Sequence, residues 1–396
     1  MGAGQSLDCT IPCGYEEALE RAIEILEDCD SAKQEFKVVF DAHADGTADF
    51  ETMQDILDQA GLDMIGMSLR SSLSKQGEFE RFDFNGDGEL QFYEAWKCFL
   101  FNLKQFVKEY GHAAQVNVPS MSPEEAGYTI TKTLGEGGQG VIKLARSTKH
   151  GDVALKVYDK SNENAANLSE LIGELEIMKE IQRSQYVMHC FEIFQDSEHF
   201  YCVDELLGGG DLTGIREKAP QNGIKLEEPY WRAVFVQCVR GLDYMHRHGL
   251  MHCDIKEENI MFKTKNYAKP EMVIIDFGLS QFSAKDGIKG GGTPGYVPPE
   301  THTDEVWYPR GDVFSMGVVF FQLLANMEDL FTDEDLLPDA RDEDAAIAEL
   351  TKSREPPWER IAGQYPAVKP WLGKMLAKQR MDRFTGSVLL QQPWFQ

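Results

Sequence analysis

A glycine-rich turn between two strand-forming segments restricts the folds open to this chain. The turn has the pattern G-x-G-x-x-G over residues 135–140, and β-branched runs at 128–133 and 141–145 flank it. A dinucleotide-binding fold places a helix directly after such a turn. Here the strand pattern continues and recurs at 153–158. The turn is therefore predicted to connect two strands of a sheet.

Polar residues then follow in a fixed order. In sequence, the motifs are Val-Ala-Leu-Lys156, His-Cys-Asp254-Ile-Lys-Glu-Glu-Asn259, Asp276-Phe-Gly and Pro-Pro-Glu300, with a helical pattern at 167–183 that carries Glu174. Any one of these motifs recurs by chance, but the whole ordered set does not.

The ordered set resembles the signature of eukaryotic-type protein kinases over residues 127–396. The resemblance implies an α+β domain of two lobes, which agrees with strand patterns first and helical patterns after Pro229. It also implies transfer of the γ-phosphoryl group of ATP to serine or threonine. Lys256 matches the Ser/Thr-specific pattern, in which this lysine contacts the γ-phosphate.

The resemblance assigns the catalytic roles. Lys156, oriented by Glu174, is expected to hold the α- and β-phosphates of ATP. Asn259 and Asp276 are expected to hold Mg²⁺. Asp254 is expected to accept and align the substrate hydroxyl.

Further positions match the nucleotide pocket of the family. They comprise the phosphate-covering turn, the apolar slot around adenine, the hinge that hydrogen-bonds adenine, and an acidic residue near the ribose. In that order they are Gly135, Glu136, Gly137 and Gly140; Leu134, Ile142, Ala154 and Met261; Glu205 and Leu207; and Asp211.

Departures from the family pattern carry their own expectations. Cys253 replaces the arginine that pairs with a phosphorylated activation segment, so activation is predicted not to need phosphorylation within 279–292. Asp204 occupies the gatekeeper position, where a buried carboxylate needs a partner that the sequence does not name. Glu300 and Arg383 match an ion pair of the family, and Asp312 matches the aspartate that anchors the catalytic loop.

A second kind of motif lies in the first third of the chain. Residues 83–94 fit the twelve-position EF-hand loop, whose alternating oxygen ligands suit Ca²⁺. The predicted ligands are Asp83, Asn85, Asp87, the Glu89 carbonyl and the bidentate Glu94. Gly88 permits the sharp turn, and Leu90 is expected to pair with a neighbouring loop.

Residues 41–52 form a weaker copy of this loop. Asp41 and Asp45 keep oxygen ligands, but His43 and Thr52 replace an oxygen ligand and the bidentate glutamate. Because Ca²⁺ affinity depends on the number of charged oxygens, this loop is predicted to be weak or to serve as an empty structural partner.

Charge separates these two parts of the chain. Residues 1–125 hold 25 acidic and 9 basic residues, so this first third of the chain carries more than half of the whole chain's net charge of −27. This balance disfavours nucleic acid as a partner. The predicted organisation is a tail at 1–14, an all-α EF-hand pair at 15–109, a linker at 110–126 and a kinase domain at 127–396.

Together the parts resemble a calcium-dependent protein kinase, with the calcium module before the catalytic domain as in some protist kinases. Calcium is expected to act through the apolar stripe 92–107, although burial within its own unit explains most of that stripe. The alternatives are a calcium-binding pseudokinase scaffold and a constitutive kinase with a passive calcium module. The implied cofactors are ATP, Mg²⁺ and Ca²⁺.

Substrates and location are weaker inferences. Asp211 and Glu258 match positions that contact basic residues upstream of a phosphosite, which favours protein substrates with basic flanks. No apolar run approaches a membrane span, and the expected location is cytoplasmic. Gly2 fits a myristoylation pattern and Cys9 and Cys13 are candidate palmitoyl sites, so peripheral membrane contact is an alternative.

Overall fold

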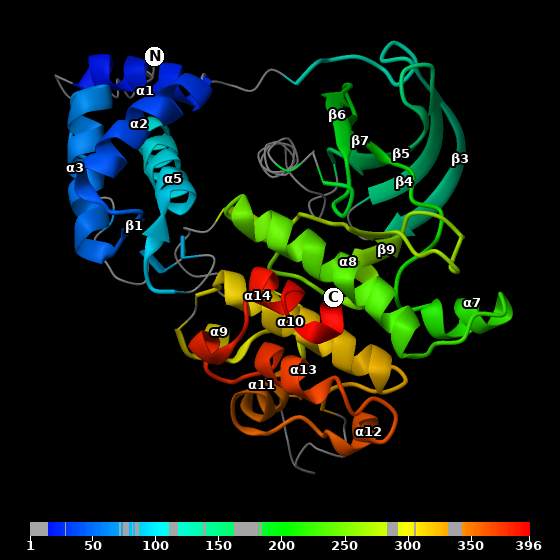
Figure 1. Cartoon of the computed structure of the whole chain (residues 1–396). Coiled ribbons are helices and arrows are strands. Elements are labelled where there is room, and N and C mark those ends of the chain that lie inside the picture. The colour runs from blue at the N-terminus through cyan, green and yellow to red at the C-terminus, as the bar shows by residue number, and fades with distance from the viewer. Residues whose placement is uncertain are drawn as a thin grey trace, which may run out of the picture. The chain divides into compact units, whose positions relative to one another are not determined.

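The computed structural model describes residues 15–27, 29–70, 73, 79–80, 82–83, 87–110, 118–137, 140–161, 181, 184–282, 292–304, 306–331 and 343–396. The chain divides into two compact units, 1–116 and 117–396, and the boundary lies within the predicted linker (Figure 1). The candidate acylation sites Gly2, Cys9 and Cys13 lie outside the described residues. No helix in the described ranges is long and apolar enough to cross a bilayer.

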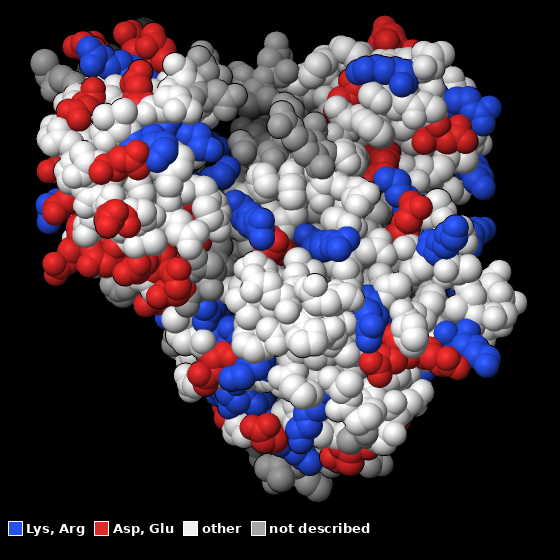
Figure 2. All heavy atoms as spheres, in the orientation of Figure 1, with Lys and Arg blue, Asp and Glu red and all other residues white. Residues whose placement is uncertain are grey.

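The N-terminal unit consists of helices and one short pair of strands. Its elements are α1 (Tyr15–Glu27), α2 (Cys29–His43), β1 (Thr47–Ala48), α3 (Phe50–Ile65), β2 (Leu90–Gln91) and α5 (Phe92–Tyr110). The antiparallel β1–β2 pair sets Ala48 opposite Leu90 and so confirms the predicted pairing of Leu90 with the other acidic loop. Figure 2 shows acidic side chains gathered on the surface of this unit.

Aromatic residues fill the core of the N-terminal unit. Phe36 of α2 is fully buried, and its ring lies 4.9 Å from Phe99 and 5.3 Å from Trp96 of α5. At the other end of α5, Phe106 stacks on Tyr15 at 6.0 Å. The apolar stripe of α5 is therefore largely used within its own unit.

The start of α2 differs from the sequence-based expectation. The Ser31-Ala-Lys-Gln34 pattern is typical of a capping box that opens a helix, but the helix begins at Cys29. Only one residue separates α1 from α2, and the Cys29 thiol donates to the carbonyl of Leu26 across that junction. Ser31 therefore lies inside the first turn, where its side chain cannot act as the cap.

The second unit opens with a five-stranded antiparallel sheet in the order β3-β4-β5-β7-β6. Its strands are β3 (Tyr128–Gly137), β4 (Gly140–Ser147), β5 (Gly151–Asp159), β6 (Cys190–Gln195) and β7 (His199–Glu205). The strand predictions at 128–158 are confirmed. Gly137 pairs with Gly140, so the glycine-rich turn closes a hairpin.

A helical lobe follows the sheet (Figure 1). Its helices are α7 (Ile215–Gln221), α8 (Glu228–Arg247), α9 (Pro299–Asp304), α10 (Pro309–Leu324), α11 (Glu343–Ser353), α12 (Glu359–Ala362), α13 (Lys369–Met375) and α14 (Gly386–Leu390), with short 3-10 turns η2 (Glu257–Asn259), η4 (Arg380–Asp382) and η5 (Pro393–Phe395). Its short strands are β8 (Leu250–Met251), β9 (Ile260–Phe262), β10 (Met272–Ile274) and β11 (Gln281–Phe282).

Helix α10 forms the centre of this lobe. Every residue from Gly311 to Leu324 is buried, so the helix is enclosed on all sides rather than amphipathic. Phe320 stacks on Phe235 of α8 with ring centroids 3.8 Å apart. This packed centre supports the loops that carry the polar motifs.

Candidate active site

The β9–β10 hairpin brings two of the predicted magnesium ligands together. Ile260 pairs with Ile274, and the amide of Ile275 donates to the carbonyl of Asn259 at 2.9 Å. Asn259 precedes β9 and Asp276 follows β10, so both lie at the same end of the hairpin. Asp276 has a φ of 65°, a conformation uncommon for a residue with a side chain and characteristic of functional sites.

Asp254 is the most extensively bonded residue of the site. Its Oδ1 accepts bonds from the Thr293 amide at 3.1 Å and the Thr293 hydroxyl at 2.7 Å. Its Oδ2 lies 3.0 Å from Lys256 Nζ and 3.1 Å from Asn259 Nδ2. The ammonium also donates to the Thr293 hydroxyl at 2.9 Å. The carboxylate is thus fixed on both oxygens.

The pKa of Asp254 follows from these contacts. Burial acts to raise the pKa, but the hydrogen bonds from Thr293 and Lys256 and the charge of Lys256 outweigh it. The net pKa lies below its usual value. Asp254 is therefore ionised at neutral pH, as a residue that aligns a substrate hydroxyl requires.

Asn259 presents its amide in a defined direction. Its nitrogen donates to the backbone carbonyl of Asp254 at 2.8 Å as well as to Oδ2. The amide oxygen is left for another partner. With the carboxylate of Asp276 it forms a pair of hard oxygen donors, which is the ligand chemistry that Mg²⁺ prefers.

Asp312 anchors the loop that carries Asp254, as the sequence predicted. It is fully buried. Its Oδ1 accepts from the Cys253 amide at 2.9 Å and Trp307 Nε1 at 3.0 Å. Its Oδ2 accepts from the His252 amide at 2.8 Å and contacts His246 Nε2 at 3.0 Å. One carboxylate from α10 therefore binds groups from three other segments.

Lys156 lies on β5, and the structure identifies the partner of Asp204 that the sequence could not. Lys156 Nζ is 3.3 Å from Asp204 Oδ2, and the carboxylate side chain is 1% exposed. The two residues meet because β5 and β7 are neighbours, with Ala154 opposite Asp204. Glu174, predicted to orient Lys156, lies outside the described residues.

The predicted nucleotide positions surround this strand pair. Ala154 lies on β5, Ile142 is opposite Lys156 on β4, and Leu134 lies at a β-bulge in β3. Leu134 and Ile142 are 43% and 38% exposed, although both are large and apolar. Gly140 is required by packing, since a Cβ there would lie 2.3 Å from the carbonyl oxygen of Val157.

The remaining predicted positions lie on the turn and between the lobes. Gly135 is half-buried, Glu136 is exposed, and Gly137 ends β3. Asp211 pairs with Met261 of β9 in an isolated bridge. Glu205 ends β7 and forms an ion pair with Lys263 at 2.8 Å, and the half-buried Leu207 follows.

Glu257 was not predicted as a notable residue, yet it is 1% exposed beside Asp254. Its Oε2 accepts from the Tyr296 hydroxyl at 2.6 Å, and its Oε1 has no hydrogen-bond partner. Burial raises the pKa of Glu257 to about 7, and the charges of Glu258 and Asp329 act in the same direction. The only sequence signal is an acidic residue within four consecutive polar positions, 256–259.

Replacing Glu257 by Gln is expected to change how stability depends on pH. The folded-state pKa of about 7 exceeds the ordinary 4.5, so the native state holds the proton more tightly and wild-type stability falls between these pH values. The glutamine of E257Q does not titrate, so the variant does not lose stability over this pH range. At pH 8 it is expected to be more stable than wild type by about 2 kcal/mol. Urea denaturation at pH 5 and 8 measures the difference, with the exposed neighbour E258Q as control. Parallel pH curves for wild type and E257Q would contradict the assignment.

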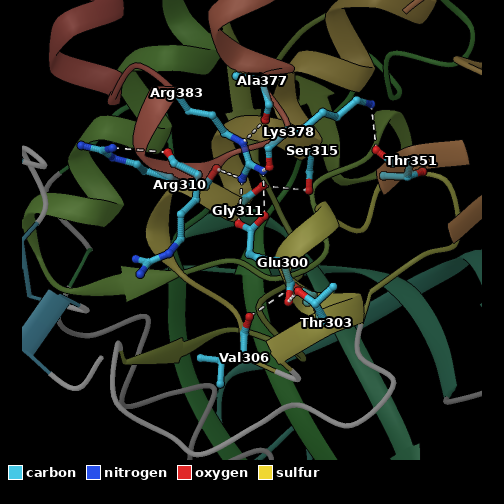
Figure 3. Close-up of polar contacts among 12 residues, drawn as sticks. Glu300, Thr303, Val306, Arg310, Gly311, Ser315, Thr351, Ala377, Lys378 and Arg383 are labelled. Carbon is cyan, nitrogen blue, oxygen red and sulfur yellow. Dashed lines mark hydrogen bonds and ion pairs between the residues drawn. The ribbon is translucent and has the colours of Figure 1, made fainter. Parts of the chain in front are cut away.

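The predicted ion pair of Glu300 and Arg383 is confirmed (Figure 3). Both guanidinium nitrogens bind the carboxylate at 2.7 Å, and both side chains are buried. The same guanidinium also donates to backbone carbonyls, including those of Ala377 at 2.7 Å and Arg310 at 3.1 Å. The pair joins α9 to the residue that directly follows η4, and its hydrogen bonds offset the cost of burying two charges.

In the N-terminal unit, loop 83–94 buries two of its carboxylates and exposes two. Asp83 is 7% exposed and accepts from the amides of Asp87 at 3.1 Å and Gly88 at 2.9 Å. Glu94 is fully buried and accepts from the Gln91 amide at 2.8 Å. Asp87 and Glu89 are exposed, and Asn85 lies outside the described residues.

Loop 41–52 has a related backbone but different side-chain contacts. Gly46 and Gly88, at the same position of the two loops, have φ angles of 89° and 88°. Asp41 is paired with Lys37 at 2.8 Å, and His43 Nδ1 contacts the carbonyl of Val39 at 2.9 Å. Asp45 is exposed. Two of the three predicted ligands are thus engaged with their own helix.

Comparison with family models matches residues 128–395 to the protein kinase domain. It finds no EF-hand family in the chain. The expectation of a two-lobed kinase domain is therefore confirmed, while the assignment of the N-terminal unit to the EF-hand family has no such support.

Individual relatives agree with the family match. A probable myosin light chain kinase of Dictyostelium discoideum is 28% identical over 65% of this chain and 64% of its own length. CBL-interacting protein kinase 33 of rice, Oryza sativa subsp. japonica, is 32% identical over 68% of this chain and 56% of its own. CDPK-related kinase 7 of Arabidopsis thaliana is 29% identical over 67% of this chain and 45% of its own.

The matched parts thus cover only 45% to 64% of the length of these relatives. The family model, however, covers more than half of this chain and includes Lys156, Asp254, Asn259 and Asp276. The chain therefore belongs to the protein kinase family.

Proposed function

We propose that the chain is a calcium-regulated protein kinase that transfers the γ-phosphoryl group of Mg-ATP to serine or threonine hydroxyls of proteins. The observation that carries the catalytic part is the ionised Asp254 held between Thr293, Lys256 and Asn259. This carboxylate is placed to accept the hydroxyl hydrogen bond and to align the oxygen for attack.

Nucleotide binding is supported by the surroundings of Lys156. Its ammonium lies in the sheet lobe beside the exposed apolar residues Leu134 and Ile142. Large exposed apolar side chains are informative when they line a concave site, because a planar base would cover them. Asn259 and Asp276 would hold Mg²⁺, whose charge would stabilise the transferred phosphoryl group.

The proton of the attacking hydroxyl has a defined first acceptor. Asp254 Oδ2 already receives bonds from Lys256 and Asn259, and Oδ1 receives the Thr293 bonds. A substrate hydroxyl would join these hydrogen bonds to Asp254 and would be oriented by them. Lys256 then stays close enough to stabilise negative charge on the phosphoryl oxygens.

Independence from phosphorylation of the activation segment is the second part of the proposal. Cys253 is fully buried in an apolar cluster with Met251, Val297 and Trp307, so its thiol is placed for packing. Burial raises the pKa of the thiol well above its usual value, and the nearby Asp312 adds to this effect. A neutral buried thiol cannot bind a phosphate as the family's arginine does.

Replacing Ser280 and Ser283 by Ala is therefore expected to leave kcat/KM within about twofold of wild type. Ser280 is 8% exposed and donates to the carbonyl of His252, which makes it a poor phosphosite. Steady-state kinase assays of the purified double variant measure the effect. Loss of activity in a variant that keeps its far-ultraviolet circular dichroism would contradict the proposal.

Calcium binding is proposed for loop 83–94. Asp83 and Glu94 are buried carboxylates at the first and last positions of this loop, and a divalent cation would offset the cost of burying them. The pairing of Leu90 with Ala48 couples this loop to loop 41–52, so ordering one loop would affect the other. The contact of Asp41 with Lys37 favours loop 41–52 as a loop that binds Ca²⁺ weakly or serves as a structural partner.

Replacing Glu94 by Gln is expected to raise the Ca²⁺ concentration for half-maximal kinase activity by about tenfold or more, because a bidentate charged ligand is lost. Activity across a calcium titration measures this in wild type and E94Q. The exposed Glu51, which follows the N-cap of α3, provides the matched control E51Q. Equal rates with and without Ca²⁺ in all of these proteins would favour the second candidate, a constitutive kinase with a passive calcium module.

A further inference from the structure

Three potential metal ligands meet on one face of the kinase sheet, behind Lys156. Cys202 and Asp204 are two residues apart on β7, so their side chains lie on the same face. Cys190 of β6 pairs directly with Asp204 and therefore shares that face. The strand register alone thus brings two thiols and a carboxylate together.

The distances within this cluster are short. The sulfurs of Cys190 and Cys202 are 3.4 Å apart, and Cys202 Sγ is 3.4 Å from Asp204 Oδ1. The three donor atoms all lie within 4.8 Å of one another. The residues are 2%, 1% and 1% exposed. The three side chains therefore form an enclosed group in the protein interior rather than a chance cluster of acidic residues on the surface.

We propose that Cys190, Cys202 and Asp204 form a binding site for a thiophilic divalent cation, with Zn²⁺ as the best fit. Zinc takes thiolate sulfur at about 2.3 Å and carboxylate oxygen at about 2.0–2.2 Å. Sulfurs at tetrahedral positions around such an ion are about 3.8 Å apart, so the observed spacing needs a shift of a few tenths of an ångström. The Glu192 carbonyl, 3.9 Å from Cys190 Sγ, or a water molecule would complete four-coordination.

Charge balance supports the site. Binding replaces the two thiol protons, which leave to solvent, by one divalent cation. The two thiolates and the carboxylate then carry three negative charges. The divalent cation and the ammonium of Lys156 together carry three positive charges, which balance them. Lys156 already contacts Oδ2 at 3.3 Å, while Oδ1 faces the thiols. The buried group is neutral before and after binding, which avoids the cost of an unbalanced charge.

This site goes beyond kinase activity, but it shares a carboxylate with the nucleotide site. An ion on Oδ1 draws negative charge away from Oδ2 and so weakens the contact with Lys156. Metal binding at this cluster would therefore alter the electrostatic environment of Lys156, the residue expected to hold the ATP phosphates.

Titration of the reduced full-length chain with Co²⁺, in excess Mg²⁺ and Ca²⁺, tests the proposal. We expect near-ultraviolet thiolate-to-cobalt charge-transfer absorption that saturates at one Co²⁺ per chain and disappears when Zn²⁺ is added. Oxygen-only sites, including the acidic loops and the magnesium ligands, do not give this absorption. The readout is independent of phosphoryl transfer, so failure of the metal site and failure of the kinase proposal are distinguishable.

Matched variants locate the ligands. The double variant C190V/C202V keeps apolar side chains of similar size and is expected to lose the absorption, whereas C238V removes another buried thiol and is expected to retain it. D204N is expected to weaken binding by about tenfold. Absence of charge-transfer absorption in wild type, or its persistence in the double variant, would overturn the proposal.

Discussion

Replacing Asp254 by Asn is expected to lower kcat by about 10²–10⁴-fold while the affinity for ATP stays close to wild type. The amide keeps the shape of the side chain and one acceptor oxygen, so the Thr293 contacts are largely retained. It cannot carry the charge that attracts the hydroxyl proton and that pairs with Lys256 at 3.0 Å. The loss therefore falls on the chemical step rather than on nucleotide binding.

Phosphate incorporation into a basic Ser/Thr peptide, together with nucleotide binding by calorimetry, separates these quantities. The exposed Asp382 of η4 provides a matched Asp-to-Asn control, D382N, for which unchanged activity is expected. Equal phosphate incorporation by wild type and D254N would show that the measured activity comes from elsewhere. A wild-type protein that binds nucleotide but transfers no phosphate would favour the pseudokinase scaffold.

The catalytic loop could be predicted from sequence because its members are close in the chain. Asp254, Lys256 and Asn259 lie within six consecutive residues, and their mutual contacts follow from a single tight loop. Their relation to Asp276 needed one further fact, the register of β9 against β10. The family resemblance supplied that relation before the structure did.

The partner of Asp204 could not be predicted in this way. Its contact with Lys156 depends on β5 and β7 being neighbours in the sheet, although 48 positions separate the two residues. The approach of Cys190 to Cys202 depends likewise on the register of β6 against β7. Strand order and register are properties of the whole sheet, and local sequence patterns do not determine them.

Local signals also failed where two elements meet. The Ser31–Gln34 pattern is typical of a helix start, but α2 begins earlier because α1 ends one residue before it. Glu257 has no signal that distinguishes it from its neighbour Glu258, yet one is buried and the other exposed. The difference arises from the side to which η2 turns each residue, toward Tyr296 in the case of Glu257.

Replacing Asp312 by Ala is expected to lower the free energy of unfolding of the kinase domain by about 4 kcal/mol or more. The carboxylate is fully buried and satisfies four groups, the amides of His252 and Cys253 and the rings of His246 and Trp307. Each buried donor left without an acceptor costs about 1–3 kcal/mol. Because two of these groups belong to the catalytic loop, activity should fall even in the fraction that folds.

Graded variants distinguish lost hydrogen bonds from simple cavity formation. D312N keeps the volume, but its amide nitrogen cannot accept, so two of the four groups lose their acceptor whichever way it points. Its cost is expected to approach that of D312A. W307F removes a single donor at 3.0 Å together with part of the buried indole ring, so a loss of about 1–3 kcal/mol, smaller than that of D312A, is expected. Chemical denaturation of the three variants measures this order. A D312N protein as stable as wild type would show that shape, rather than the four hydrogen bonds, holds the catalytic loop on α10.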